Sequence, residues 1–67
     1  MTIYCIRTRR PGEQSWQFVG RGHTVTDLRS QALTYDTEQL AARWVPHWRQ
    51  KLPGRELKVS PITAYNV

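Results

Sequence analysis

Apolar and polar residues alternate over the first third of the chain, a pattern typical of β-strands. Residues 2–8 are rich in β-favouring side chains and contain no glycine or proline. Residues 15–21 alternate too, with Trp16 and Phe18 on one side. Pro11-Gly12 lies between the two segments and predicts a turn. Together the segments predict a β-hairpin.

The next part of the chain, residues 20–35, is rich in turn-forming residues. Gly20-Arg21-Gly22 resembles a fragment of a phosphate-binding loop, but a bulge or turn is the favoured interpretation because no helix follows it. Residues 23–26 are expected to continue the second strand beyond this bulge. Residues 27–31 predict a turn or one helical turn with Asp27 as its cap. Residues 32–35 predict a short edge strand.

A helical period follows. Apolar residues recur at spacings of three and four and form one stripe: Leu40, Ala41, Trp44, Val45, Trp48 and Leu52. This stripe predicts a helix over about residues 37–52. Asp36 is expected to be the N-cap with Gln39 at the third helical position, and Tyr35 to pack against Leu40.

Pro46 interrupts this helix. Proline has no amide hydrogen for the Ala42 carbonyl, and its ring clashes with the preceding turn, which costs about 3 kcal/mol in a straight helix. We therefore expect either a kink near residues 42–46 or a break at which Pro46 opens a second short segment. Pro53-Gly54 ends the helix in both cases.

The alternating pattern returns in residues 55–60 and predicts a last strand, with Leu57 and Val59 facing inward. Pro61 favours an edge position or the end of this strand, and residues 62–67 either extend the sheet or lie loose. The element order predicts a single small α+β domain over residues 1–67. Its Pro-kinked helix packs on a mostly antiparallel sheet made of a hairpin, a short strand and a C-terminal strand.

The aromatic residues are expected to be used inside the domain. A chain of 67 residues buries only about 60% of its unfolded surface, so its core is thin. Trp44 and Trp48 are therefore predicted to be core residues. Trp16 and Phe18 either stack bases on an exposed sheet face or lie under the helix, and we expect the helix to cover them. Charged rims and backbone edges would then remain for partners.

Few residues offer chemistry. Cys5 is the only cysteine, so it forms no intramolecular disulfide, and its place in a strand predicts a small buried hydrophobe. With His23 and His47 it completes no zinc-binding spacing, so no metal or cofactor is expected. Scattered acids in so small a domain predict no enzymatic activity. The sequence shows no secretory signal or membrane-spanning run, so a cytoplasmic setting is expected.

The charge balance favours an acidic partner. Ten Lys and Arg against five Asp and Glu give a net charge of +5. Eight cations are candidate contacts, in one group at the hairpin and another around the helix end and last strand: Arg7, Arg9, Arg10 and Arg21, and Arg49, Lys51, Arg55 and Lys58.

Several turn and cap signals occur together in this chain: W-x-F-V-G-x-G over residues 16–22, Thr26-Asp27, Ala32, and Tyr35-Asp36-Thr37 before an Ala-bearing helix. Over residues 2–60 this pattern resembles small, uncharacterised accessory proteins of bacteriophages, prophages and other mobile elements. The ββαβ plan is similar to that of small phage proteins that inhibit host machinery, such as RNA polymerase or CRISPR effector complexes. The resemblance implies a protein that acts in the host cytoplasm.

Two functions follow as hypotheses. The first is a non-catalytic binding module that modulates a host protein complex through an acidic surface on that complex. The alternative is a basic nucleic-acid-binding module that uses the hairpin arginines, with affinity that falls steeply as salt rises. A third interpretation is a subunit that only completes a larger assembly.

Overall fold

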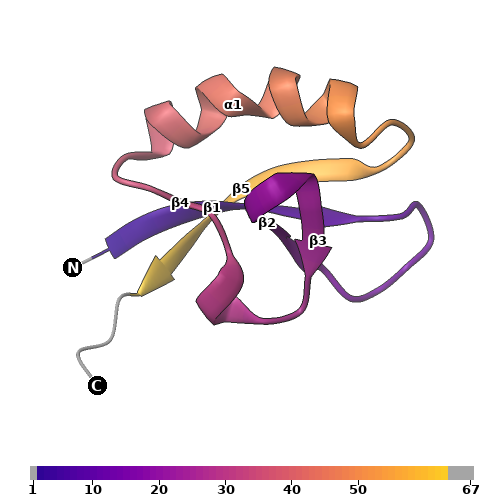
Figure 1. Ribbon diagram of the computed structural model, residues 1–67, viewed down its shortest axis with the longest axis horizontal. Coiled ribbons are helices and arrows are strands. Elements are labelled where there is room, and N and C mark those ends of the chain that lie inside the picture. The colour runs from indigo at the N-terminus through magenta and orange to yellow at the C-terminus, as the bar shows by residue number, and fades with distance from the viewer. Residues whose placement is uncertain (1, 64–67) are drawn as a thin grey trace.

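The computed structural model describes residues 2–63. In chain order its elements are β1 (Thr2–Arg9), β2 (Gln17–Gly20), the short 3-10 segment η1 (Arg21–His23), β3 (Thr24–Thr26), a second 3-10 segment η2 (Arg29–Gln31), β4 (Thr34–Tyr35), α1 (Glu38–Lys51) and β5 (Glu56–Thr63). The strands form one antiparallel sheet and α1 lies across one of its faces (Figure 1). The predicted α+β architecture is confirmed.

β1 is the centre of the sheet. Along one edge it pairs with β5 over its whole length, from Thr2 opposite Thr63 to Arg9 opposite Glu56. Along its other edge, β1 pairs with β4 near its start and with β2 near its end. β3 pairs with β2 and extends the sheet outward. In Figure 1, β3 and η2 extend to the side away from α1.

The turn between β1 and β2 is built as the sequence predicts. The amide of Glu13 donates to the carbonyl of Arg10 at 3.0 Å, and Gly12 has a φ of 90°. Proline at the second position and a left-handed glycine at the third are the features of a type II turn. The Glu13 carboxylate also accepts from the Arg10 amide at 2.9 Å. The predicted hairpin is therefore confirmed.

The chain reverses after β2, and the prediction that residues 23–26 continue this strand is wrong. Gly22 and His23 both have left-handed backbones, with φ of 70° and 60°. Two consecutive residues of this kind turn the chain back, so β3 returns antiparallel to β2 with Val25 opposite Val19. Gly20 has no room for a side chain, because a Cβ atom there would lie 2.9 Å from the Thr24 hydroxyl.

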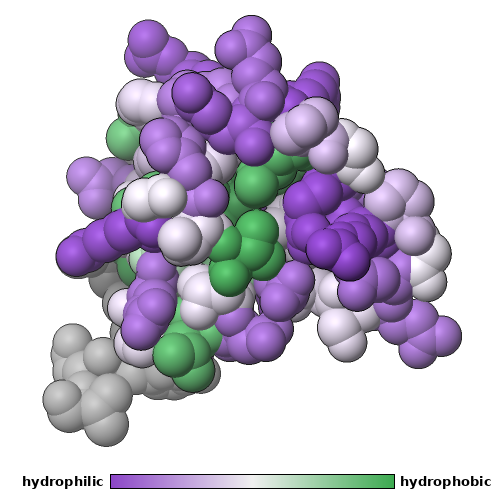
Figure 2. All heavy atoms as spheres, turned by 45° about the vertical axis from the view of Figure 1, so that its right-hand side comes forward, coloured by the Kyte–Doolittle hydropathy of each residue, from purple (hydrophilic) through white to green (hydrophobic). Residues whose placement is uncertain are grey.

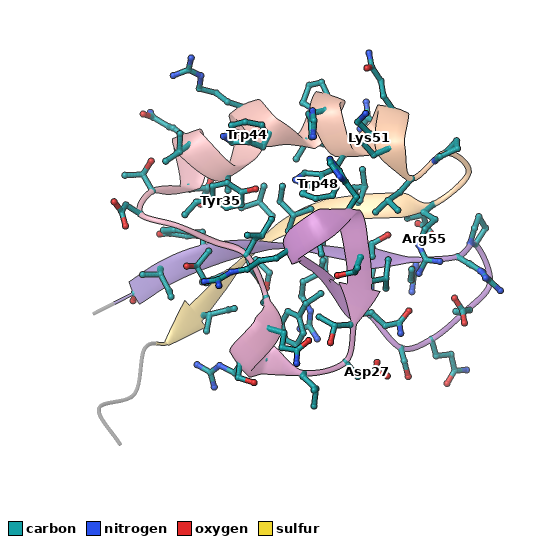
Figure 3. The ribbon with its side chains drawn as sticks, in the orientation of Figure 1. Asp27, Tyr35, Trp44, Trp48, Lys51 and Arg55 are labelled. Carbon is teal, nitrogen blue, oxygen red and sulfur yellow. The ribbon has the colours of Figure 1, made fainter. Side chains whose placement is uncertain are left out.

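The predicted cap at Asp27 is also wrong. The 3-10 segment η2 has Leu28 at its N-cap position and no side-chain cap hydrogen bond. Thr26 instead accepts from the Leu28 amide through its hydroxyl, at 3.0 Å. Asp27 lies at the side of the molecule farthest from α1 (Figure 3).

The helix begins one residue later than its predicted cap implies. Thr37, and not Asp36, is the N-cap, and its hydroxyl accepts from the Leu40 amide at 3.0 Å. An extended backbone at Thr37, with φ −132° and ψ 156°, brings its side chain to this amide. Tyr35 and Leu40 therefore no longer occupy the two positions of a hydrophobic staple.

We expect Thr37→Ala to lower the free energy of unfolding by about 1 kcal/mol, because a helical amide loses its acceptor. Asp36→Ala should cost less than half as much, since it removes only a charge near the helix N-terminus. Urea unfolding of the two variants measures the difference. A larger loss in Asp36→Ala would show that Asp36 is the cap after all.

α1 continues through Pro46 as a single helix, which excludes a break, one of the two alternatives that the sequence leaves open. Ala42, whose carbonyl lacks its usual donor, and Pro46 are both exposed residues. Water can therefore solvate that carbonyl on the outer side of the helix. Buried Ala41 and Trp48 lie on either side of Pro46 in the sequence and hold both halves of α1 on the sheet.

The core lies between α1 and the sheet. Ile6, Val19 and Trp48 are buried together, and five partly buried side chains pack against them: Leu33, Tyr35, Val45, Leu52 and Leu57. The Trp48 indole N–H donates to the Tyr35 hydroxyl at 3.3 Å, and both side chains lie between the helix and the sheet (Figure 3). No helix within residues 2–63 has the length and apolar character to cross a membrane.

Part of the predicted helical stripe lies outside this core. Leu40 is 37% exposed and Trp44 43% exposed, so the prediction that Trp44 is a core residue is wrong. The sheet contacts of α1 are with β1, β4 and β5. The stripe is wider than this contact, and Leu40 and Trp44 occupy its solvent side.

β5 runs from Glu56 to Thr63, three residues beyond the predicted end of the last strand. Pro61 lies within it, opposite Tyr4. Among the described strands β5 pairs with β1 alone, so Pro61 lies on an edge strand as predicted. The rest of the tail, residues 64–67, lies outside the described part of the chain.

Candidate functional site

One face of the sheet points away from α1, and it carries cations. Ile6 faces the helix and contacts the Trp48 cluster, so its neighbours on β1, Arg7 and Arg9, point to the other face. Directly opposite residues of antiparallel strands share a face. Phe18 and Lys58, the cross-strand partners of Arg7, therefore lie on this second face with it.

Trp16 joins this group from the loop before β2. The Arg9 guanidinium carbon lies 4.4 Å and the Lys58 ammonium 4.2 Å from the centre of the Trp16 ring. Each distance is typical of a cation–π contact. The expectation that α1 covers Trp16 and Phe18 is wrong, because the register of β1 and β2 turns Phe18 to the opposite face. We call Arg7, Arg9, Trp16, Phe18 and Lys58 the cation–aromatic face.

Arg7 is held firmly within this face. Its guanidinium carbon lies 4.7 Å from the centre of the Phe18 ring, and one terminal nitrogen donates to the Trp16 carbonyl at 3.3 Å. Its Nε atom is buried and has no hydrogen-bond partner within residues 2–63. A buried donor without a partner costs about 1–3 kcal/mol. An apolar side chain here would avoid that cost.

Glu56 supplies the carboxylate of this surface. It accepts from the Arg9 Nε at 3.0 Å, with side chains that are 29% (Arg9) and 44% (Glu56) exposed. Such a solvated pair contributes at most about 1 kcal/mol. The Glu56 carboxylate nevertheless orients the Arg9 guanidinium, which stays near the Trp16 ring. Three cations against one carboxylate leave this surface positive.

The remaining predicted cations lie elsewhere. Arg10 is exposed at the β1–β2 turn, next to the cation–aromatic face, and Arg21 is exposed in η1. Arg49 and Lys51 are exposed in the last turn of α1, where they complement the helix dipole. Figure 2 shows mainly hydrophilic side chains at the end of the molecule that carries the β1–β2 turn and the end of α1.

Arg55 has a structural role on the helix side of the sheet. Its Nε donates to the hydroxyl of buried Thr8 at 3.0 Å, and a terminal nitrogen donates to the Gln17 side chain at 3.2 Å. These bonds satisfy a buried hydroxyl and link the residue before β5 to β1 and β2. Of the second predicted group, only Lys58 reaches the cation–aromatic face.

Cys5 is fully buried, as predicted. Burial raises the pKa of its thiol above the usual value, and the positive charges of Arg7 and Arg29 offset part of this rise. The thiol therefore stays protonated near neutral pH. A reactive cysteine needs the thiolate and access to solvent, and Cys5 has neither.

Comparisons with known proteins match no family model, no curated protein and no solved structure. Function is therefore inferred from the surface chemistry of the chain itself.

The sequence contains a signal for the cation–aromatic face. In the run Arg7-Thr8-Arg9, alternation places Thr8 on the face of Ile6 and both cations on the other face. A hairpin that pairs Thr8 with Gln17 then places Trp16 opposite Arg9. Register, which the sequence leaves open, decides this placement.

Proposed function

We propose that this chain is a non-catalytic module that binds single-stranded nucleic acid on the cation–aromatic face. The observation that carries the proposal is Trp16, which lies on the sheet face away from α1 with Arg9 and Lys58 over its ring. Single-strand binders combine a positive surface that follows the phosphates with aromatic side chains that contact the bases.

The cations of this face are suited to phosphate. Arg7 and Arg9 on β1 and Lys58 on β5 lie side by side across the sheet, and Arg10 extends the positive surface to the turn. Contacts with the aromatic rings hold these side chains in place before a ligand arrives, so less side-chain entropy is lost on binding. Arginine adds a fork of donors that matches two phosphate oxygens.

Nucleic acid is preferred over a host protein because of where the aromatic residues lie. A protein partner would be the preferred hypothesis only if the aromatic side chains were buried in the core and could not contact bases. Trp16 and Phe18 instead belong to a charged face, and Trp44 is 43% exposed. The Nε of Arg7 adds support, because it is buried without a hydrogen-bond partner within residues 2–63 and the packing of the domain does not explain it.

Fluorescence anisotropy with a labelled single-stranded oligonucleotide of about 12 nucleotides tests the proposal. We expect the affinity to fall steeply between about 50 and 200 mM salt. The double variant Arg9→Ala/Lys58→Ala should bind at least about tenfold more weakly. Its plot of log affinity against log salt should be shallower by about 1.4, at 0.7 for each phosphate that is no longer neutralised.

Two further variants serve as controls. Arg49→Ala/Lys51→Ala removes the same charge from the end of α1 and should change the affinity by less than about threefold. Glu56→Gln should strengthen binding, because it frees Arg9 from its carboxylate. Absence of binding at low salt, or an equal loss in both double variants, would refute this function and favour a protein partner.

A further inference from the structure

Two histidines from distant parts of the chain meet beside the helix. His23 in η1 and His47 in α1 are 24 residues apart in sequence, and their Nε2 atoms lie 3.4 Å apart. The contact is at the surface and away from the cation–aromatic face, so it is independent of the function proposed above. The sequence has no C-x-x-C or H-x-x-x-H spacing that would predict this histidine contact.

The separation of the two nitrogens fits a shared metal ion. At 3.4 Å it exceeds the usual range of about 2.7–3.2 Å for an N–H hydrogen bond. Zinc binds histidine nitrogen at about 2.0–2.1 Å, so two nitrogens on a tetrahedral zinc are about 3.3–3.4 Å apart. The pair therefore already has the spacing of two adjacent zinc ligands.

Aromatic packing holds both rings in this arrangement. The His47 ring makes edge contacts with Trp44 and Trp48, at centroid distances of 5.3 and 5.4 Å. The His23 ring lies 5.2 Å from that of Trp48, a core residue. Ligands held by packed neighbours lose little freedom when a metal binds.

The backbone conformation of η1 also positions the His23 ring next to His47. Among residues 2–63, His23 is the only residue other than glycine with a positive φ, which is 60°. It follows Gly22, whose φ is 70°, and together they bring the His23 ring against α1. Sparsely populated backbone conformations of this kind are concentrated at ligand sites and switches.

We propose that His23 and His47 form a two-histidine site for a divalent transition-metal ion, with zinc as the ion whose geometry fits. Imidazole nitrogen suits zinc, copper and nickel, whereas magnesium requires oxygen ligands. Within residues 2–63 no third His, Cys, Asp or Glu joins the pair. The remaining positions are open to water or to an external ligand, and a bound ion would tie η1 to α1.

Calorimetric titration of the full chain with zinc chloride tests this site. We expect one zinc per chain and no binding of magnesium. His23→Asn and His47→Gln should each weaken zinc binding at least about tenfold, because even the loss of an outer-shell partner costs that much. Asparagine tolerates the positive φ at position 23 and glutamine suits a helix, so both variants should fold.

Cys5→Ala is the matched control. Cys5 carries the one thiol of the chain and is fully buried, so the variant should bind zinc as the parent does. Circular dichroism verifies that each variant is folded. Zinc-dependent shifts of both imidazole ring signals in the NMR spectrum provide a second readout. No binding up to about 1 mM zinc, undiminished binding in either histidine variant, or loss of binding in Cys5→Ala would overturn the proposal.

Discussion

Trp48→Ala is expected to remove a large part of the stability of the domain, about 3–5 kcal/mol. Trp48 is 3% exposed, packs with Ile6 and Val19, and donates to the Tyr35 hydroxyl. Replacing a buried tryptophan with alanine costs about 3–5 kcal/mol. A domain of 67 residues has only about 3–10 kcal/mol of stability in total, so this one change removes much or all of it.

Trp44→Ala is the matched control, one helical turn away on α1. Trp44 is 43% exposed and contacts His47 by its edge, so its loss should cost only about 1 kcal/mol. Urea unfolding followed by far-ultraviolet circular dichroism compares the two variants, because the backbone signal does not depend on the indoles. Similar losses in both variants would contradict the division of α1 into a core side and a solvent side.

This pair also shows what the helical pattern can and cannot predict. The spacing of apolar residues correctly predicts α1 and its buried residues Ala41 and Trp48. The spacing predicts the same burial for Trp44 and Trp48, because both lie within the apolar stripe. Contact with the sheet separates them, because Trp48 packs with Ile6 and Val19 whereas Trp44 is 43% exposed.

The strands illustrate the same division. Alternation and the Pro11-Gly12 turn predict the hairpin of β1 and β2 correctly. The reversal at Gly22 and His23 is not predictable in this way, since a glycine after a strand fits a bulge as well as a turn. Thr37 and Asp36 are both good capping residues, and only the backbone conformation distinguishes them.

The candidate site is predictable in its charges but not in its grouping. Arg7 and Arg9 lie on one face because of the period of a strand, which the sequence shows. Lys58 joins them because of the long register between β1 and β5, while Arg55 binds Thr8 on the other face. The contact between His23 and His47 depends on the unforeseen reversal after β2. These residues are distant in sequence, and the pairing and order of the strands bring them together.

Pro46→Ala is expected to stabilise the domain by about 2 kcal/mol. Within α1 the change restores an amide donor for the Ala42 carbonyl and removes a ring clash, a gain of about 3 kcal/mol. The unfolded chain becomes more flexible without the proline, which offsets about 0.4–1 kcal/mol of this gain. Since Pro46 is exposed, the core should keep its packing. Urea unfolding measures the net effect as a higher midpoint with an unchanged slope.

Pro53→Ala is the control for the unfolded-state term. Pro53 follows α1 in an exposed turn, so its replacement removes no helical defect and should destabilise by about 0.4–1 kcal/mol. The two proline variants should therefore shift the midpoint in opposite directions. A loss of stability in Pro46→Ala would mean that the packing of Val45 and Trp48 on the sheet depends on a bend imposed by the proline. In that case Pro46 would determine how the core packs. The continuous helix indicates instead that core packing compensates for the missing hydrogen bond at Pro46, which lies on the solvent side of α1.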